Sequence, residues 1–213
     1  MEPAMDNTEE LQRILEALLL ASEQPLSVDR ILALFDEAER PSKPQLKQAL
    51  ENLKAALEGR AVELREVGNG WRLQTRPAYA GWISKLWEEK PPRYSRALLE
   101  TLALICYRQP ISRAEIEEVR GVSLSQSILK TLLERSWVRV VGHREVPGRP
   151  ALFGTTKEFL DDFNLRDLEE LPSLPDIRDL DALAAALERL HGPERAAAAE
   201  SGEAAPQGPE TLH

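Results

Sequence analysis

The sequence predicts a mainly α protein with small β-hairpins (α+β), built as two tandem winged-helix domains joined by a linker helix. Two observations carry the prediction. Within the 213 residues, three helical patterns followed by a hairpin pattern occur twice. The segment Gln24-Pro25-Leu26-Ser27 also recurs 85 residues later as Gln109-Pro110-Ile111-Ser112, at the same junction between helices. We therefore predict one fold repeated in tandem and followed by a disordered acidic tail.

The first unit begins with three helical patterns. Apolar residues at three- and four-residue spacing predict a helix from Asn7 or Thr8 to about Ser22. Ser27 is a candidate N-cap for a short second helix that extends to Phe35. A third helix is expected after the loop at residues 41–44, ending at Gly59.

A hairpin and a linker helix follow. Apolar and polar residues alternate over 62–66 and 71–75, on either side of Gly68-Asn69-Gly70, which tolerates positive φ. One further helix is expected from Pro77 to the Pro91-Pro92 pair, where we place the domain boundary. Its aromatic residues are Tyr79, Trp82 and Trp87.

These linker aromatics can serve either the core or an interface. Three apolar helices already supply one small core, so a further aromatic face has little room inside it. Aromatic residues are enriched at protein interfaces. We therefore predict that Tyr79, Trp82 and Trp87 form the interface of a homodimer, with core packing as the alternative.

The second unit repeats the order of the first. Ser112 and Ser123 are placed to begin helices, and Pro110 and Gly121 are placed to end them. Trp137 lies at the start of the first strand, where we expect it in the core. The predicted elements are helices over 95–109, 112–121 and 123–133, strands over 137–141 and 151–155, and a wing over 142–150.

Two segments follow the domains that we predict at residues 1–92 and 93–172. Behind Asp176, apolar residues at helical spacing predict a short amphipathic helix within 173–191, packed either on the body or on a partner. From Gly192 the composition is dominated by Ala, Glu, Pro, Gly and Ser, which predicts a disordered tail. The apolar residues of the short helix are Ile177, Leu180, Leu183, Leu187 and Leu190.

Composition excludes several classes of protein. Cys106 is the only cysteine and the three histidines are scattered, so an internal disulfide, a zinc site and a Cys/His nucleophile pair lack their parts. Cys106 lies on an apolar stripe and is expected to be buried. No apolar run suits a membrane span, and the acidic N-terminus argues against a signal peptide. We expect a cytoplasmic protein with no catalytic residues, cofactor or metal.

Charge argues against strong nucleic-acid binding. The net charge is -9, and residues 95–163 hold 10 basic and 9 acidic side chains. A basic excess would be needed for tight binding to phosphates, so we expect weak or indirect contact with DNA. A winged-helix DNA-binding transcriptional regulator is the alternative function. However, the third helix of the second unit begins Ser123-Leu124-Ser125-Gln126-Ser127, and its first cation is Lys130.

Two long motifs resemble those of a known family. They are YRQPISRAEIEEVRGV at 107–122 and PGRPALFGTT at 147–156, accompanied by Phe159-Leu160, Ala21-Ser22-Glu23 and LEELP at 168–172. Together they are similar to the bacterial segregation and condensation protein B family, over about Leu11 to Pro172. Family members usually have Ala, Tyr and Gly where this chain has Cys106, Phe153 and Asn164. After Gly, Asn is the residue that best suits a left-handed helix C-cap, so Asn164 is compatible with that position.

The resemblance implies a non-catalytic subunit of the SMC–kleisin condensin-like complex. Such a subunit acts in chromosome condensation and segregation during cell division, in the cytoplasm at the nucleoid. It is homodimeric through its N-terminal half and binds the kleisin subunit, segregation and condensation protein A. The kleisin bridges the ATPase heads of the SMC protein, so contact with the SMC ATPase is indirect.

We predict that the kleisin binds the second unit. Arg149 lies between a turn glycine and a φ-locked proline, which would hold its guanidinium at a defined angle for a carboxylate. Arg149 can equally satisfy local backbone carbonyls. If the short helix exposes Ile116, the polar residues around it form a rim. The candidate contact residues are Arg113, Glu115, Ile116, Arg120, Arg149 and Phe153.

Overall fold

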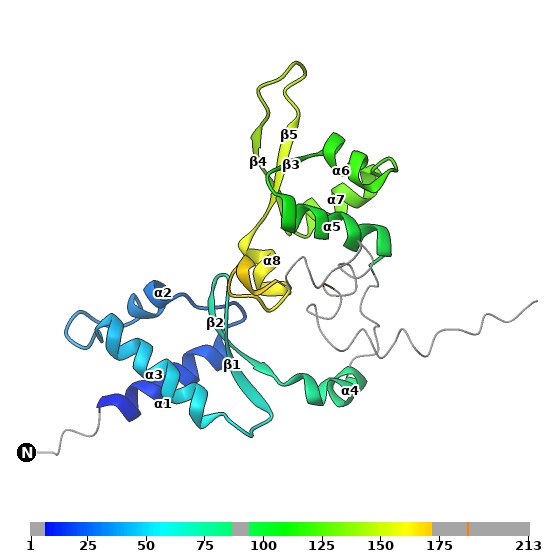
Figure 1. Cartoon of the computed structure of the whole chain (residues 1–213). Helices are drawn as coiled ribbons and strands as arrows, with labels where there is room; N and C mark the ends of the chain where they lie inside the picture. The colour runs from blue at the N-terminus through cyan, green and yellow to red at the C-terminus, as the bar shows by residue number, and fades with distance from the viewer. Residues whose placement is uncertain (1–6, 87–93, 172–186, 188–213) are drawn as a thin grey trace, which may run out of the picture.

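The computed structural model describes residues 7–86, residues 94–171 and Leu187. Figure 1 shows two lobes of helices, each with a small sheet, as expected for an α+β fold. We call residues 7–86 the first half and 94–171 the second half. The helices and strands of the first half are α1 (Asn7–Ala21), α2 (Val28–Leu32), α3 (Lys43–Ala56), β1 (Val62–Val67), β2 (Gly70–Thr75) and α4 (Ala80–Ile83). Those of the second half are α5 (Arg96–Arg108), β3 (Ile111–Ser112), α6 (Arg113–Arg120), α7 (Gln126–Glu134), β4 (Val138–His143), β5 (Ala151–Thr155) and α8 (Lys157–Asp162).

The first half is a three-helix core closed by a hairpin. Ser27 caps α2 by accepting the Arg30 N–H, and Ser42 forms a capping box with Gln45 at the start of α3. The β1–β2 hairpin pairs Val62 with Thr75 and continues to its tip. The core side chains are Leu11, Leu15, Leu19, Ile31, Leu46, Ala49, Leu50, Leu53, Leu57, Leu64 and Trp71.

The second half has its own core around Trp137. The Trp137 side chain is fully buried and makes edge contacts with Tyr94 and Phe163, at ring-centroid distances of 4.9 and 5.0 Å. The Trp137 indole N–H donates to Asp162 at 2.6 Å. The sheet has the order β3-β5-β4, so β5 is central and β4 is an edge. The two buried clusters of the two halves share no residue.

The repeat seen in the sequence has a structural counterpart. In the first half Leu26 and Trp71 exchange backbone hydrogen bonds of 2.8 and 2.9 Å. In the second half Ile111 is paired in the same way with Phe153 of β5. Ser112 also caps α6 as Ser27 caps α2, which confirms that the matching segments occupy equivalent places.

Three expected elements differ from the structure. Residues 77–86 are not one helix but two 3-10 turns around the four-residue α4. The Ser84 hydroxyl donates to the Gly81 carbonyl, and both residue types disfavour a helix interior. The helix capped by Ser27 ends at Leu32 rather than Phe35. The third helix expected in the second unit, α7, is capped by Ser125 and not by Ser123.

Several expectations for individual residues are confirmed. Cys106 and Trp137 are buried, as expected. Asn164 has a φ of 57°, which is the left-handed conformation expected after a helix end. Leu187 is helical and only 1% exposed, and it belongs to the buried cluster of the second half.

The remaining expectations fall outside the described residues. These are Trp87, the boundary at Pro91-Pro92, residues 173–191 apart from Leu187, and the tail at 192–213. In the part of the chain that the structure describes, no helix has both the length and the apolar character needed to cross a membrane.

Candidate partner-binding surfaces

Glu115 connects α6 to the β4–β5 hairpin of the second half. Its Oε2 accepts the Ser112 N–H at 2.9 Å and the Ser112 hydroxyl at 2.7 Å, completing a capping box. Its Oε1 accepts from Arg144 of the hairpin region at 2.7 Å. These hydrogen bonds, led by the one from the Ser112 side chain, lower the pKa of Glu115. Glu115 therefore acts as an ionised brace between the helix and the hairpin.

Arg113 is fixed to the loop before α7. Its Nε donates to Glu117 at 2.9 Å, and its Nη2 donates to the Leu124 carbonyl. Glu117 also accepts the Leu124 N–H at 2.9 Å, and this bond is the largest cause that lowers the pKa of Glu117. The Arg113 side chain keeps 43% of its surface exposed, so it remains accessible to a partner.

Three of the predicted contact residues lie inside the second half. Ile116 is fully buried and Phe153 is 6% exposed, because α6 packs on α5 and β5 is the central strand. The polar rim required α6 to expose Ile116, and that condition is not met. Arg120 is only 7% exposed and donates to Glu100 of α5 at 2.9 Å. These three residues therefore lie beneath the exposed surface of the second half.

Arg149 is the predicted contact residue that is most available. It is exposed, follows Gly148, and has a positive φ of 37°. Its backbone N–H donates to the Val146 carbonyl at 2.9 Å. Within residues 7–86 and 94–171 its guanidinium makes no hydrogen bond or ion pair. The alternative role of satisfying local carbonyls is therefore absent from the described part of the chain.

Exposed valines surround this face of the second half. Val146 lies in the β4–β5 hairpin, which projects away from the helices in Figure 1. Val119 and Val122 lie at the end of α6 and just beyond it, and the exposed fractions of the three are 44%, 37% and 55%. A shallow cavity of about 440 Å³ lies beside α6. It is lined by Arg108, Pro110, Ile111, Glu115, Glu118 and Val119.

The first half exposes the predicted linker aromatics. Trp82 is 72% exposed and Tyr79 is 41% exposed, so core packing is not their role in the single chain. Leu86 is 75% exposed, and Lys85 places its Nζ 4.5 Å from the centroid of the Trp82 ring. We call Tyr79, Trp82 and Leu86 the aromatic face.

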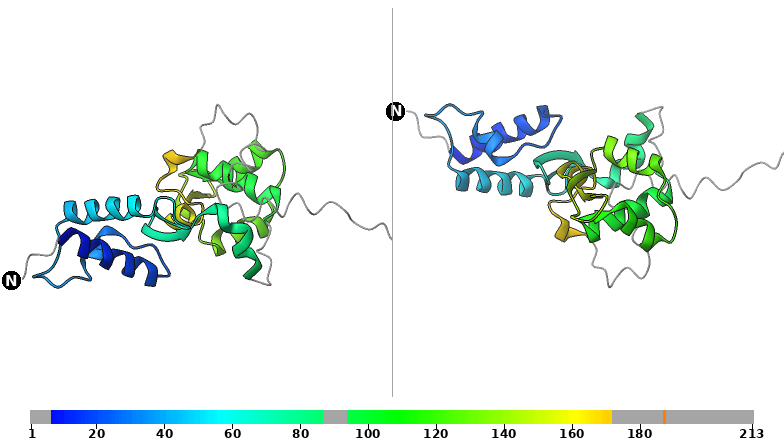
Figure 2. Two further views of the ribbon diagram at one scale, coloured as in Figure 1. Left: turned by 90° about the horizontal axis from the view of Figure 1, so that it is seen from below. Right: turned by 90° about the horizontal axis from the view of Figure 1, so that it is seen from above.

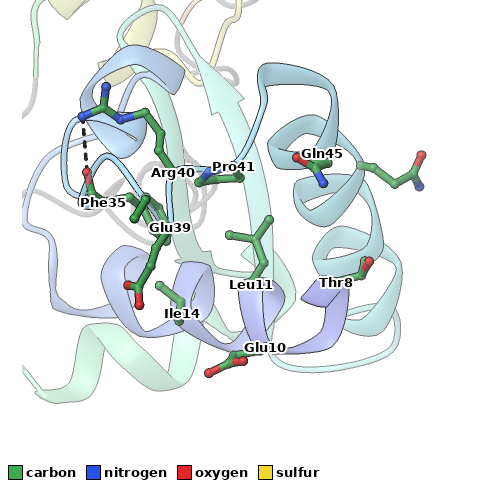
Figure 3. Close-up of a pocket in the computed structure, with 11 residues that line it drawn as sticks. Thr8, Glu10, Leu11, Ile14, Phe35, Glu39, Arg40, Pro41 and Gln45 are labelled. Carbon is green, nitrogen blue, oxygen red and sulfur yellow. Dashed lines mark hydrogen bonds between the residues drawn. The ribbon is translucent and has the colours of Figure 1, made fainter. Parts of the chain in front are cut away.

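A groove in the first half was not predicted. Its cavity of about 690 Å³ lies between α1 and the loop that joins α2 to α3 (Figure 3). Arg40 closes one side by donating to the Phe35 carbonyl at 3.3 Å. Ile14, which the sequence placed on the apolar stripe of the first helix, is 37% exposed and lines the groove. A helical stripe predicts burial but not how far a neighbouring loop covers it.

The described residues carry no group of three or more His, Cys, Asp or Glu side chains arranged to hold a metal ion. The sequence has one thiol, and its side chain is buried. Cys106 is buried in α5, and burial raises the pKa of its thiol far above the usual range.

The chain is similar to proteins of one bacterial family. The family described as "Segregation and condensation complex subunit ScpB" matches residues 13–174. A "Segregation and condensation protein B homolog" from Coxiella burnetii is 58% identical over 172 residues, covering 81% of this chain and 82% of the relative. The "Segregation and condensation protein B" of Syntrophotalea carbinolica is 44% identical over 176 residues, covering 82% of this chain and 87% of the relative.

Two solved structures are also similar. The crystal structure of ScpB from Mycobacterium tuberculosis is 35% identical, with a TM-score of 0.35, and covers 76% of this chain and 99% of its own. A structure described as a dimer of ScpB N-terminal domain complexed with ScpA peptide is 28% identical, with a TM-score of 0.35. It covers 41% of this chain and 100% of its own. On the match of the family over residues 13–174 and the 58% identity of its relative, this chain belongs to the segregation and condensation protein B family.

Proposed function

We propose that this chain is a non-catalytic subunit of an SMC–kleisin complex that acts in chromosome condensation and segregation. It homodimerises through its first half and binds the kleisin, segregation and condensation protein A, through its second half. Contact with the SMC ATPase is indirect, through the kleisin. Family membership over residues 13–174 supports the assignment to this complex.

The aromatic face supports the homodimer. Trp82 and Leu86 together place two large apolar side chains, 72% and 75% exposed, on one short stretch of the first half. Exposed aromatic surface of this kind is typical of interface cores. Trp87 continues the same stretch and lies outside the described residues.

Arg149 carries the kleisin proposal. Its exposed guanidinium makes no polar contact with the described residues, and Val146 exposes apolar surface three positions away. A carboxylate beside an apolar side chain is the complementary chemistry. Arg113 adds a second accessible cation, so we place an acidic, partly apolar kleisin segment on the β4–β5 hairpin and the start of α6.

The order of helices and hairpin in each half supports two winged-helix units, but several features disfavour a DNA-binding regulator. The helix α7 begins with Gln126 and Ser127, and Lys130 is paired with Glu134 at 3.6 Å. A recognition helix instead presents unpaired basic side chains, beside amide groups, to base edges. The tip of the β1–β2 hairpin lies against the second half and is not free to enter a groove.

The test is the mass of the purified chain alone and mixed with its kleisin, by light scattering. We expect a dimer alone and a larger complex with the kleisin. The second half is the proposed site, so the Arg149→Ala chain should form less complex while its own dimer persists. Monomer alone and no complex would overturn the proposal. Tight, sequence-selective binding to a DNA duplex in a fluorescence anisotropy titration would support the regulator in its place.

A further inference from the structure

The two halves touch where the tip of the β1–β2 hairpin meets the end of α8 (Figures 1 and 2). Asp161 of α8 is only 8% exposed. Its Oδ1 accepts the backbone N–H of Asn69 at 2.9 Å, and its Oδ2 accepts from the Asn69 side-chain amide at 2.5 Å. Both oxygens of one buried carboxylate are thus used by a residue of the other half.

Two arginines of the hairpin bind the turn that follows α8. Arg72 donates to the Asp161 carbonyl at 2.9 Å and to the Asn164 side chain at 2.6 Å. Arg65 donates to the Asn164 carbonyl at 2.9 Å. Burial is the largest influence on Arg72 and lowers its pKa, while Asp161 and Asp162 act in the opposite direction. A guanidinium remains charged in proteins, so Arg72 is a half-buried cation held by the second half.

Close packing accompanies these hydrogen bonds. A Cβ added at Gly68 would lie 2.6 Å from the Cβ of Leu160 and 3.0 Å from the Lys157 carbonyl oxygen. Two carbon atoms that are not bonded cannot approach so closely, so a side chain does not fit at position 68. The hairpin backbone itself therefore contacts α8. The contact is therefore specific in shape as well as in charge.

We propose that this contact is a rigid joint that holds the two halves in one fixed orientation. A loose encounter would leave Asp161 solvated. Here its carboxylate is buried and both of its oxygens accept hydrogen bonds from Asn69, so a change in the angle between the halves would break these bonds. The two apolar cores share no residue, so they do not set the angle between the halves. The polar joint does so instead.

The joint also has a consequence for assembly, and this step rests on the proposed function. A fixed angle keeps the aromatic face and the surface around Arg149 at a constant separation. A partner that contacts both halves, or contacts the second half of a dimer, then meets a preformed arrangement and loses less orientational freedom on binding.

The test is a distance measured between the halves of the full chain without any partner. Nitroxide labels are attached at Lys47→Cys in α3 and Lys130→Cys in α7, both exposed positions. Cys106 is buried and is expected to stay unlabelled. Excess unlabelled protein is added, so that electron–electron resonance reports distances within one chain. We expect one narrow distance distribution.

Two variants act on the joint by different means, and a third is the control. Asp161→Asn replaces an acceptor oxygen and removes the charge, whereas Gly68→Ala wedges the hairpin away from α8 without changing any charge. Glu158→Gln is the matched control, since Glu158 is exposed on α8 and makes no hydrogen bond to the described residues. We expect the two joint variants to lose the narrow distribution and the control to keep it.

A fold readout separates the joint from damage to one half. Near-ultraviolet circular dichroism of the buried Trp137 environment should be unchanged in Gly68→Ala, because this change lies in the other half. A broad distribution in the parent chain, or the same narrow one in all four proteins, would overturn the joint. Because no kleisin is present, either result would leave the proposed function to its own test.

Discussion

Asp161 and Asn69 lie 92 positions apart in the sequence and are joined by two hydrogen bonds through both oxygens of the carboxylate. This pair turns a hairpin tip into a contact between the two halves. Each residue of the hairpin tip makes a different contact. Gly68 allows the close approach to α8, Asn69 supplies two donors, and Gly70 allows an approach to Leu26 on the other side.

Gly70→Ala should destabilise the first half. Gly70 has a φ of 139°, and an added Cβ would lie 2.3 Å from the Leu26 carbonyl oxygen. Strain and loss of the Leu26–Trp71 backbone pair should together cost about 2 kcal/mol or more in the free energy of unfolding. Urea denaturation, monitored by fluorescence, measures this free energy of unfolding. Gly81→Ala is the control, because open space surrounds its added Cβ and Ala favours the helix. Equal stability of both variants would contradict the strain argument.

Trp82→Ala should weaken the homodimer. A central interface tryptophan contributes about 2 kcal/mol or more to binding, so the dissociation constant should rise more than about tenfold. Sedimentation velocity over a range of concentrations measures the change. Leu20→Ala is the matched control, since Leu20 is an equally exposed apolar residue of the first half, at 75%. If only the Leu20 variant dissociated, the interface would lie on α1 and not on the aromatic face.

Arg149→Ala should reduce kleisin affinity by about 1–3 kcal/mol while the homodimer persists. The Arg149 side chain is exposed and its guanidinium makes no hydrogen bond or ion pair with the described residues, so little stability should be lost. Calorimetry gives the affinity and the melting temperature together. Arg139→Ala, an exposed arginine on β4, is the control for charge on the same hairpin. Unchanged binding with a lowered melting temperature would show that Arg149 serves the hairpin alone.

Arg120→Ala should lower stability. Arg120 and Glu100 form a largely buried pair, with 7% and 17% of their side chains exposed, and Arg96 also donates to Glu100 at 3.1 Å. Removal of Arg120 leaves Glu100 with one of its two cations, so we expect a loss of about 1–3 kcal/mol. Thermal unfolding measures the loss. Glu118→Gln, an exposed change on the same helix, should leave the melting temperature nearly unchanged. A stable Arg120→Ala chain with weak kleisin binding would return Arg120 to the contact surface.

Acid should weaken the start of α6 through Glu115. The pKa of Glu115 is lowered in the folded chain below its unfolded value of about 4.3, so its contribution is present above the unfolded pKa. The contribution is lost as the pH falls through the folded pKa. Glu115→Gln keeps the capping box, so its melting temperature should fall less than that of the parent chain between about pH 5 and pH 3. Identical pH profiles would show that the Glu115 charge adds nothing.

The sequence predicted local backbone structure correctly where a residue acts on its near neighbours in the chain. Ser27 and Ser112 cap the helices expected of them, and Asn164 takes the left-handed conformation expected at a helix end. The recurrence of Gln-Pro-Leu/Ile-Ser located two equivalent backbone pairings. The prediction of one linker helix was wrong, and the reason is also local. Gly81 and Ser84 interrupt the helix that the spacing of the aromatic residues had suggested.

The candidate site was only partly predictable. The exposure of Trp82 and Arg149 agrees with the expected surface, but Ile116, Arg120 and Phe153 lie inside. A short helix with polar residues on several sides does not reveal which side faces the core. That choice depends on where α5 and β5 pack against α6, and β5 is distant from α6 in the sequence.

By itself the sequence determined the tandem order of elements, the two apolar cores and the family, because periodicity, capping and motif residues act over a few positions. Only the tertiary structure decided that Asp161 is buried against Asn69 and that Gly68, besides its place in the hairpin turn, contacts α8. Both depend on two segments about 90 residues apart meeting at one place. Burial and pairing of polar groups follow from that meeting, and no local pattern encodes it.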